Sequence, residues 1–324
     1  MFILGIDVGN YDTKSQHTTL PSGFEGPTPE KPLFAKEYLE LNGKYYIPTV
    51  ERFAYEKDKT RSERCLILTL FSIAKEIHRA VTKAKNDLSH EDVQRLINNV
   101  KEIALGVGLP PTHYTRARID EMTTYYKKHL GNGIQFVWND YDFNIYMKTC
   151  RVYPQGGSAA SEPENTFRTK YSTYYVVDIG GYTVDIIKFK DGQVDGKWDS
   201  KEEGVLIMFD DIINKVQMNY DTTLDNTLIE DILNGKETIL ADDVLTFIKE
   251  NVQKHSDTII DIARQVGVEF KAYPVLFGGG GSLLLKDFIF KNNLINQKAT
   301  IVLPDACANA KGYARLLKQE LHAC

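Results

Sequence analysis

The sequence has few cysteines, and their spacing suggests neither a metal site nor a disulfide framework. The four cysteines lie far apart, no two form a Cys-x-x-Cys pair, and none is at zinc-ligand spacing from the seven histidines. No apolar run approaches the roughly 20 residues of a membrane-spanning helix, and the apolar start turns acidic at Asp7, unlike a signal peptide. We therefore expect reduced, mostly buried thiols in a soluble cytoplasmic protein with no membrane partner.

The sequence also lacks an excess of positive charge. Its 39 Lys and Arg residues and 44 Asp and Glu residues give a formal net charge of −5, which argues against a surface built to bind phosphate backbones. Direct nucleic-acid binding is therefore not expected. The 324 residues exceed the roughly 250–300 at which a single hydrophobic core stops growing, so two domains are expected.

Strand and helix patterns alternate along the chain and predict an α/β architecture. Buried strands are expected at 2–8, 103–109, 134–138 and 143–154, then into Asp178, from Val184, and at 273–277. Helices are expected at 63–85, after a cap at Ser89–Asp92, and at 116–130, 205–218, 242–266 and from Asp305 onward. The segment 20–60 suggests short peripheral strands, and residues 161–172 suggest a linker.

Two similar acidic turns stand out against this background. Asp7-Val8-Gly9-Asn10-Tyr11 is echoed by Asp178-Ile179-Gly180-Gly181-Tyr182, each at the end of an apolar strand. The glycines let backbone N–H groups approach an anion, while the carboxylate would repel it unless a cation such as Mg²⁺ lies between them. The pair of turns therefore predicts a two-sided grip on a polyphosphate, to which Lys14 adds a positive charge.

A third glycine-rich stretch, Phe277-Gly-Gly-Gly-Gly-Ser282, follows another apolar run. It does not match the Walker pattern, because no Lys-Ser/Thr follows at the right offset. It does not match G-x-G-x-x-G either, because Leu283 and Leu284 occupy the positions where the final glycine would fall. Bare backbone of this kind suits a flat ligand, and we expect a strand, a glycine turn and a helix that together hold a purine base.

With these motifs in hand, the chain resembles the actin/Hsp70/sugar-kinase superfamily of ATPases. "GIDVGNYDTK" and "VVDIGGYTVDI" resemble its two phosphate motifs, "VYPQGGSAA" and "DACANAKGYAR" its connecting motifs, and "VLFGGGGSLLLKDFI" its adenosine motif. Within the superfamily the chain is most similar to the bacterial actin-like plasmid-segregation proteins, the ParM/Alp group. "PSGF" near residue 21 and "GLPPTHYTR" at 108–116 add to that similarity.

The resemblance implies a two-domain actin-like fold with a nucleotide cleft between the domains, each a ribonuclease-H-like core with a small subdomain. Domain I would be 1–160 with the helix 308–324 (subdomain about 20–62), and domain II would be 161–307 (subdomain about 205–272). It also implies ATP (or GTP) hydrolysis with Mg²⁺, head-to-tail filaments of the protein itself, and DNA segregation through a ParR-like adaptor protein bound to centromeric DNA.

The resemblance also assigns roles to individual residues. Gln155 would orient the attacking water, assisted by Asp185, and Asp7 and Asp178 would hold Mg²⁺ through water. The nucleotide would contact residues of both turns and of the glycine-rich stretch: Gly9, Asn10, Tyr11, Thr13, Lys14, Gly180, Gly181, Tyr182, Thr183, Gly204, Gly278, Gly279, Gly280, Gly281 and Leu283.

Three alternatives stay open. A small-molecule, sugar-type kinase on the same fold would need a carboxylate base, for which Asp140 or Asp142 of "WNDYD" is a candidate. The same stretch is typical of a hairpin turn, because Asn and Asp tolerate positive φ. An Hsp70-like chaperone would need a substrate-binding domain for which no chain remains. A nucleotide-binding structural protein without turnover would not need Gln155. The pair Tyr45-Tyr46 is either a polymer contact or ordinary strand.

Overall fold

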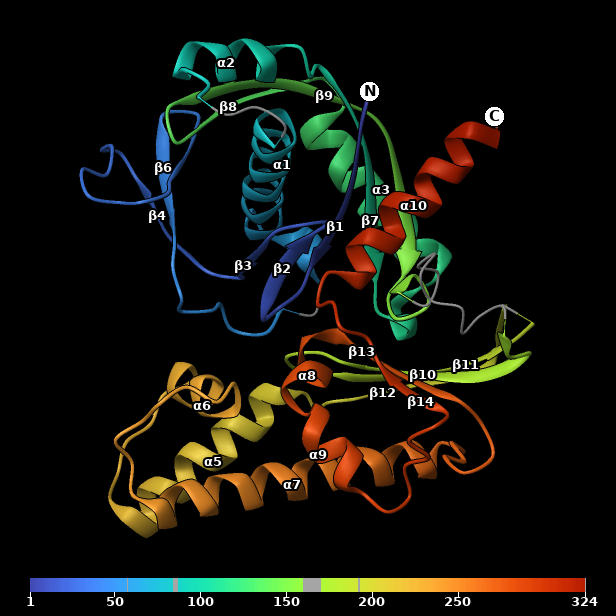
Figure 1. The fold of residues 1–324 in the computed structure, drawn as a ribbon. Helices are drawn as coiled ribbons and strands as arrows, with labels where there is room; N and C mark the ends of the chain where they lie inside the picture. Colours follow the sequence, from blue (N-terminus) through green and yellow to red (C-terminus); the bar gives the residue numbers. More distant parts are fainter. Residues whose placement is uncertain (57, 84–86, 160–169, 192, 324) are drawn as a thin grey trace. The chain divides into compact units, whose positions relative to one another are not determined.

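Figure 1 shows the chain as a computed structural model, which describes residues 1–56, 58–83, 87–159, 170–191 and 193–323. Contacts between residues divide the chain into two compact units, which are described separately below. Unit 1 comprises residues 1–162 and 307–324, and unit 2 comprises residues 163–306. Most of the expected linker at 161–172 lies outside the described residues.

Unit 1 is built on a nine-stranded mixed sheet with the order β3-β2-β1-β7-β9-β8-β5-β6-β4. Strand β9 is long enough to pair with β7 in parallel along its second half and with β8 in antiparallel fashion along its first half. It thereby joins the central strands to a peripheral group of short ones. The strands are β1 (Phe2–Val8), β2 (Asp12–Ser15), β3 (Thr19–Pro21), β4 (Phe24–Thr28), β5 (Leu39–Leu41), β6 (Lys44–Pro48), β7 (Glu102–Leu109), β8 (Ile134–Trp138) and β9 (Tyr141–Pro154).

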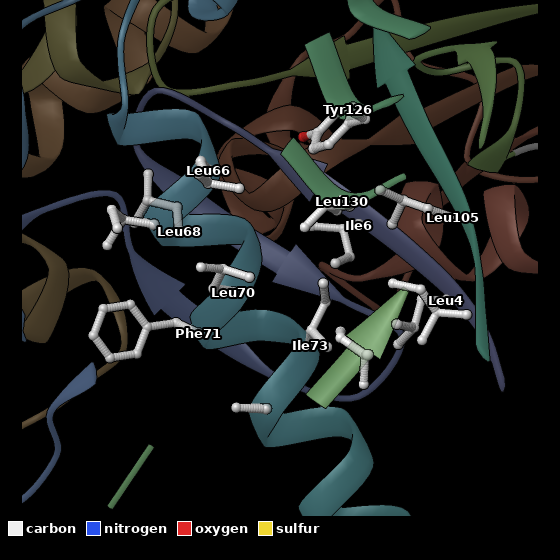
Figure 2. Close-up of a cluster of buried hydrophobic side chains, with 14 of the residues drawn as sticks. Leu4, Ile6, Leu66, Leu68, Leu70, Phe71, Ile73, Leu105, Tyr126 and Leu130 are labelled. Carbon is white, nitrogen blue, oxygen red and sulfur yellow. The ribbon is translucent and has the colours of Figure 1, made fainter. Parts of the chain in front are cut away.

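Helices cover both faces of strand β1. Leu4 and Ile6 are buried against α1, where they meet Leu70 and Ile73 in the core shown in Figure 2. Gly5 points to the opposite face and lies so close to α10 that a Cβ there would be 1.8 Å from the carbonyl oxygen of Ala310. The helices of unit 1 are η1 (Lys59–Arg61), α1 (Arg64–Thr82), α2 (His90–Asn98), η2 (Pro111–His113), α3 (Arg116–Leu130) and α10 (Ala308–Ala323).

Unit 2 has a five-stranded sheet with the order β12-β11-β10-β13-β14. Strands β10, β13 and β14 are parallel, and β11 and β12 continue the sheet in antiparallel fashion. The elements are β10 (Thr173–Ile179), β11 (Val184–Lys190), β12 (Gln193–Lys201), α5 (Val205–Tyr220), α6 (Asn226–Leu233), α7 (Asp242–Gln265), β13 (Val275–Gly278), α8 (Gly279–Leu284), α9 (Lys286–Lys291) and β14 (Thr300–Val302).

The expected α/β class is confirmed, and so are the long helices. Strands β12 and β14 and helix α6 are not predicted from the sequence, because they are short or rich in polar residues. The expected glycine turn after β13 is wrong, because α8 begins at Gly279 and takes up most of the glycine run. The cap at Ser89 is confirmed: its hydroxyl accepts from the Asp92 N–H, and the Asp92 carboxylate accepts from the Ser89 N–H in return.

Two further observations concern the described residues only. No helix within them is both long enough and apolar enough to span a bilayer. Cys65, Cys150 and Cys307 are free and buried, whereas Cys324 lies outside the described part of the chain.

Candidate functional site

The first acidic turn is the tight connection between β1 and β2. Asp7 pairs with Lys14 across the two strands, and the Gly9 N–H donates to the Asp12 carbonyl over 3.1 Å. The Ser22 hydroxyl in turn donates to the Gly9 carbonyl at 2.7 Å. A Cβ on Gly9 would stand 2.4 Å from the Asp12 carbonyl oxygen, so only glycine fits this turn.

The side chain of Gln155 reaches this turn from the end of β9. Its Nε2 donates to Oδ1 of buried Asp7 at 2.6 Å. Its backbone N–H donates to the Leu109 carbonyl at 2.9 Å, and the next N–H, of Gly156, donates to Oδ1 of Asn309 at 2.9 Å. The predicted catalytic glutamine and the predicted metal-binding aspartate of unit 1 are therefore in direct contact.

Lys14 lies on the same face of the hairpin as Asp7, because residues that pair directly across two strands project to the same side. It is half-buried. Among the residues that the structure describes, no carboxylate lies within ion-pair distance of its ammonium group. A cation beside a turn with close backbone N–H groups can attract an anion.

Two residues expected to touch the nucleotide instead brace the first turn. The Thr13 hydroxyl is fully buried and shares a 2.9 Å hydrogen bond with the Ser22 hydroxyl. The Tyr11 ring is buried beneath the guanidinium group of Arg52, whose Cζ lies 3.4 Å from the ring centroid. The expectation of phosphate contacts through these two side chains is therefore not supported.

The second acidic turn repeats the first in unit 2. Asp178 pairs with Asp185 across β10 and β11, and the Gly180 N–H donates to the Thr183 carbonyl at 2.8 Å. Each of these residues is numbered 171 above its counterpart in the first hairpin. The repeat in the sequence is therefore also a structural repeat, with the same strand register and the same turn hydrogen bond in both hairpins.

Helix α5 begins directly against this second turn. The N–H groups of Gly204, Val205 and Leu206 donate to the carbonyls of Tyr182, Gly180 and Gly181 at 3.0, 3.1 and 2.8 Å. A Cβ on Gly204 would lie 2.3 Å from the Gly181 carbonyl oxygen. Gly204 is therefore required for the helix to approach the turn.

The remaining predicted glycines lie where α8 meets β10. Gly278 pairs with Asp178, and Gly279 has a φ of +81°, with a Cβ position 2.3 Å from Asp178 Oδ1. At Gly281 a Cβ would meet Ile179 Cγ2 at 2.5 Å. Close packing explains Gly279 and Gly281, while Gly280 and Leu283 are only partly buried.

Unit 2 brings together two carboxylates suited to a hydrated cation. Asp178 and Asp185 are both buried and project from the same face of paired strands. No group of three or more His, Cys, Asp or Glu side chains within the described residues is arranged to hold a metal ion. Mg²⁺ is commonly held by one or two carboxylates with water and phosphate oxygens as further ligands, so this donor set fits Mg²⁺ bound together with a phosphate.

Of the two candidate kinase bases, Asp140 is a turn residue and Asp142 is exposed on β9. Asn139 and Asp140 both have positive φ, at 47° and 66°, in the tight turn between β8 and β9. Asp140 accepts from the Tyr38 hydroxyl at 2.8 Å and pairs with Lys31, and these hydrogen bonds lower its pKa. A carboxyl group with a lowered pKa is a poor proton acceptor, and the hairpin-turn interpretation is confirmed.

Sequence reasoning missed several residues that shape the first turn. Ser22, Arg52 and Asn309 hold the turn or its connecting segment, and Lys59 donates to the carbonyl of Val8. Ser22 lies in "PSGF" and Asn309 in "DACANAKGYAR", but neither stretch predicts a role for that residue, and Arg52 and Lys59 belong to no motif. Only the fold reveals their proximity to the turn.

No protein-family model and no curated protein sequence matches this chain. Solved structures do match over nearly its whole length. Ta0583, an archaeal actin homolog, has a TM-score of 0.73 at 17% identity, covering 99% of this chain and 100% of its own. A ParM filament from Clostridium botulinum has a TM-score of 0.72 at 18% identity, covering 98% and 100%.

The actin-like protein Alp7A has a TM-score of 0.72 at 15% identity, covering 100% of this chain and 98% of its own. At such identities the likeness is one of fold. The resemblance predicted from the five motifs is confirmed at that level: this chain has the actin-like fold of Ta0583, ParM and Alp7A.

Proposed function

We propose that this chain is a nucleotide-driven, filament-forming actin homologue that hydrolyses ATP or GTP. The single observation that carries the proposal is the repeated Asp–Gly hairpin, present once in each unit with the same register and turn hydrogen bond. Glycine turns with close backbone N–H groups suit phosphate, and neighbouring carboxylates suit its Mg²⁺. Structures of the same fold include Ta0583 in complex with ADP and a Bacillus thuringiensis ParM with ATP.

In this proposal the residues of unit 1 orient the attacking water. Because the Gln155 amide nitrogen donates to Asp7, its carbonyl oxygen is directed away as an acceptor for a water proton. A glutamine positions water without removing its proton, so turnover by the monomer is expected to be slow. Asp7 holds the amide in this orientation and Lys14 contributes positive charge next to the phosphates.

The residues of unit 2 complete the nucleotide site. Asp178 would hold Mg²⁺ through water with Asp7. Asp185, which pairs with Asp178 across β10 and β11, would add negative charge beside the cation and assist in orienting the nucleophile. When bound, Mg²⁺ would neutralise phosphate charge and orient the transferred group. The backbone N–H of Gly181 would contact phosphate, since the Gly180 N–H already donates to the Thr183 carbonyl within the turn. Gly204 and the exposed parts of Gly280 and Leu283 would flank the base.

Self-association is supported by apolar side chains exposed on the surface. Leu33 and Phe34, between β4 and β5, are 87% and 96% exposed. In unit 2, Met218 and Ile239 are 84% and 104% exposed. Large exposed apolar groups that are adjacent in sequence suggest a protein contact, and different exposed apolar groups on the two units suit a head-to-tail assembly. Tyr46, by contrast, is buried, so a Tyr45-Tyr46 polymer contact is not supported.

We propose further that the filament segregates plasmid or other DNA through a ParR-like adaptor, in the cytoplasm. The net charge of −5 supports an adaptor in place of direct DNA binding. The two units would correspond to the two expected domains, with small subdomains at about 20–62 and 205–272. The alternative of a sugar-type kinase is weakened, because Asp140 lies in a hairpin turn and pairs with Lys31, while Asp142 is exposed.

Light scattering of the purified chain with Mg-ATP or Mg-GTP, with phosphate release followed in the same sample, tests the proposal. We expect scattering to rise above a critical concentration, with phosphate release lagging behind it, and filaments in electron micrographs of the plateau. Nucleotide consumption only when a sugar acceptor is added, without scattering at any concentration, would favour the kinase instead.

A further inference from the structure

Lys59 lies at the first turn, and the described residues supply no ion-pair partner for it. It lies in η1, in the segment that leads from β6 to α1, and its Nζ donates to the carbonyl oxygen of Val8. Val8 immediately precedes the Gly9 turn. Burial of the ammonium group lowers the pKa of Lys59, against the opposing effect of the Asp7 and Glu56 charges.

Two other lysines of unit 1 have carboxylate partners, in contrast to Lys59. Lys75 pairs with the Glu37 carboxylate at 2.9 Å, and Lys31 pairs with Asp140. Within the described part of the chain, no carboxylate lies within 4 Å of the Lys59 ammonium. A partly buried charge with a single neutral acceptor is poorly compensated, so the site favours an additional anion.

A small pocket adjoins this ammonium group. Its lining includes Gly9 and Asn10 of the first turn together with Glu56, Lys59 and Arg64. Two cations and one carboxylate therefore line it, and Glu56 already accepts from the Ser62 hydroxyl at 2.7 Å. The balance of charge in the pocket is positive.

Asn10 adds a neutral donor to the same pocket. Its Oδ1 accepts from the backbone N–H of Glu56 at 3.2 Å, which fixes the orientation of the amide. The Nδ2 group then has no acceptor among the described residues. The pocket thus offers an ammonium group and an amide donor beside the glycine turn, which is the chemistry that recognises a phosphate oxygen.

We propose that Lys59 is a phosphate-binding residue, whose ammonium group moves from the Val8 carbonyl to a phosphate oxygen of a nucleotide held at the Gly9 turn. The inference rests on the proposed nucleotide-binding function. Lys14 lies on the Asp7 side of the hairpin, whereas Lys59 belongs to the segment leading into α1, which covers the side of Leu4 and Ile6. The two lysines therefore approach the turn from different sides.

Substitution by glutamine separates this role from a purely structural one. Lys59→Gln keeps an N–H donor for the Val8 carbonyl but removes the charge, and Lys59→Arg keeps the charge. We expect Lys59→Gln to bind Mg-ATP at least about tenfold more weakly, as loss of a charge-assisted hydrogen bond implies, and Lys59→Arg to stay within about threefold of the wild type. Lys44→Gln, at an exposed position on the β5–β6 hairpin, is the matched control.

Unchanged Mg-ATP affinity in Lys59→Gln would overturn the proposal, and so would equal weakening in the glutamine and arginine variants. Failure of the wild type to bind any nucleotide would instead count against the proposed function itself. If Lys59→Gln does not fold, a crystal structure of the wild type with an ATP analogue decides the question. An Nζ within hydrogen-bond distance of a phosphate oxygen supports the inference, and an Nζ still on the Val8 carbonyl refutes it.

Discussion

Nε2 of Gln155 donates a 2.6 Å hydrogen bond to Oδ1 of Asp7, which joins the end of β9 to the end of β1. This contact restricts both partners. The amide cannot rotate without losing a charge-assisted hydrogen bond, and the carboxylate keeps one oxygen occupied. The geometry gives Gln155 two separable roles, as a holder of Asp7 and as an acceptor for water.

Gln155→Ala should slow phosphate release by about 10²-fold, the loss expected when a reacting group is no longer held in position. Polymerisation should persist, because the substitution leaves nucleotide contacts of the glycine turns intact. Steady-state phosphate release and light scattering in one sample measure both quantities. Gln135→Ala, at an exposed site on β8, is the control. Unchanged phosphate release in Gln155→Ala would exclude a catalytic role.

Asp185→Asn should weaken binding of Mg²⁺ with nucleotide, because it removes one of two buried carboxylates on the same face of β10 and β11. A tenfold loss of affinity corresponds to about 1.4 kcal/mol less stabilisation of the folded state by ligand. Thermal unfolding with EDTA, with Mg²⁺ and with Mg-nucleotide measures this stabilisation by ligand. Asp191→Asn, on the exposed turn before β12, should match the wild type. Equal ligand-induced shifts in all three proteins would argue against a role of Asp185 in the site.

Gly204→Ala should displace the second turn, since its Cβ would lie 2.3 Å from the Gly181 carbonyl oxygen and 2.5 Å from the Tyr182 nitrogen. Overpacking of this kind costs about 1–3 kcal/mol, and nucleotide binding should fall with it. Denaturant unfolding and nucleotide titration report the two effects. Gly235→Asn is a suitable control, because no atom lies within 4 Å of its Cβ position and Asn tolerates the φ of +76° there. Normal nucleotide binding by a stable Gly204→Ala variant would show that the turn tolerates displacement.

Much of this arrangement is encoded locally and could be predicted from sequence. The helix at 64–82 follows from its apolar periodicity, and the cap at Ser89 follows from its spacing to Asp92. The pairing of Asp7 with Asp178 as equivalent positions follows from the repeated turn. In each case the signal is carried by residues that are near one another in the chain.

The features that could not be predicted from the sequence depend on contacts between segments that are distant in the chain. Thr13 belongs to a phosphate motif, yet the alternation of β2 turns its hydroxyl toward Ser22 in the interior. A turn is expected at the glycine run 278–281, but Gly278 ends β13 and α8 begins at Gly279, with Gly281 close to Ile179 of β10. Lys59 belongs to no sequence motif, and only the contact of η1 with the end of β1 suggests a role for it.

The unfolding free energy should fall as pH is lowered from about 7 to 5.5. Burial lowers the pKa of His255 below its ordinary value, despite the bond of its ring to the Glu203 carbonyl and the nearby charges of Glu203 and Asp211. Between the lowered folded pKa and the unfolded value of about 6.5, the unfolded chain binds more protons, so acid favours unfolding.

In denaturant titrations at several pH values, the unfolding free energy of His255→Gln should therefore depend less steeply on pH than that of the wild type. Part of the dependence should remain, because burial also lowers the pKa of His78 and His129. An identical pH dependence in the variant and the wild type would mean that His255 does not contribute.

Phe34→Ser should raise the critical concentration for polymerisation without changing the stability of the monomer. The Phe34 side chain is 96% exposed, so its loss removes almost no packing within the chain. In a filament contact it would bury apolar area at about 25 cal/mol per Å², and a loss of about 1.4 kcal/mol per contact corresponds to a tenfold higher critical concentration.

Light scattering at graded protein concentrations measures the critical concentration, and thermal unfolding of the monomer checks stability. Val50→Ser removes another exposed apolar side chain of unit 1, one that is 67% exposed and has no large apolar neighbour in sequence comparable to the Leu33-Phe34 pair. We expect Val50→Ser to polymerise like the wild type. A critical concentration that moves equally in both variants would attribute the effect to general surface hydrophobicity, and one that moves in neither would place the filament contact elsewhere.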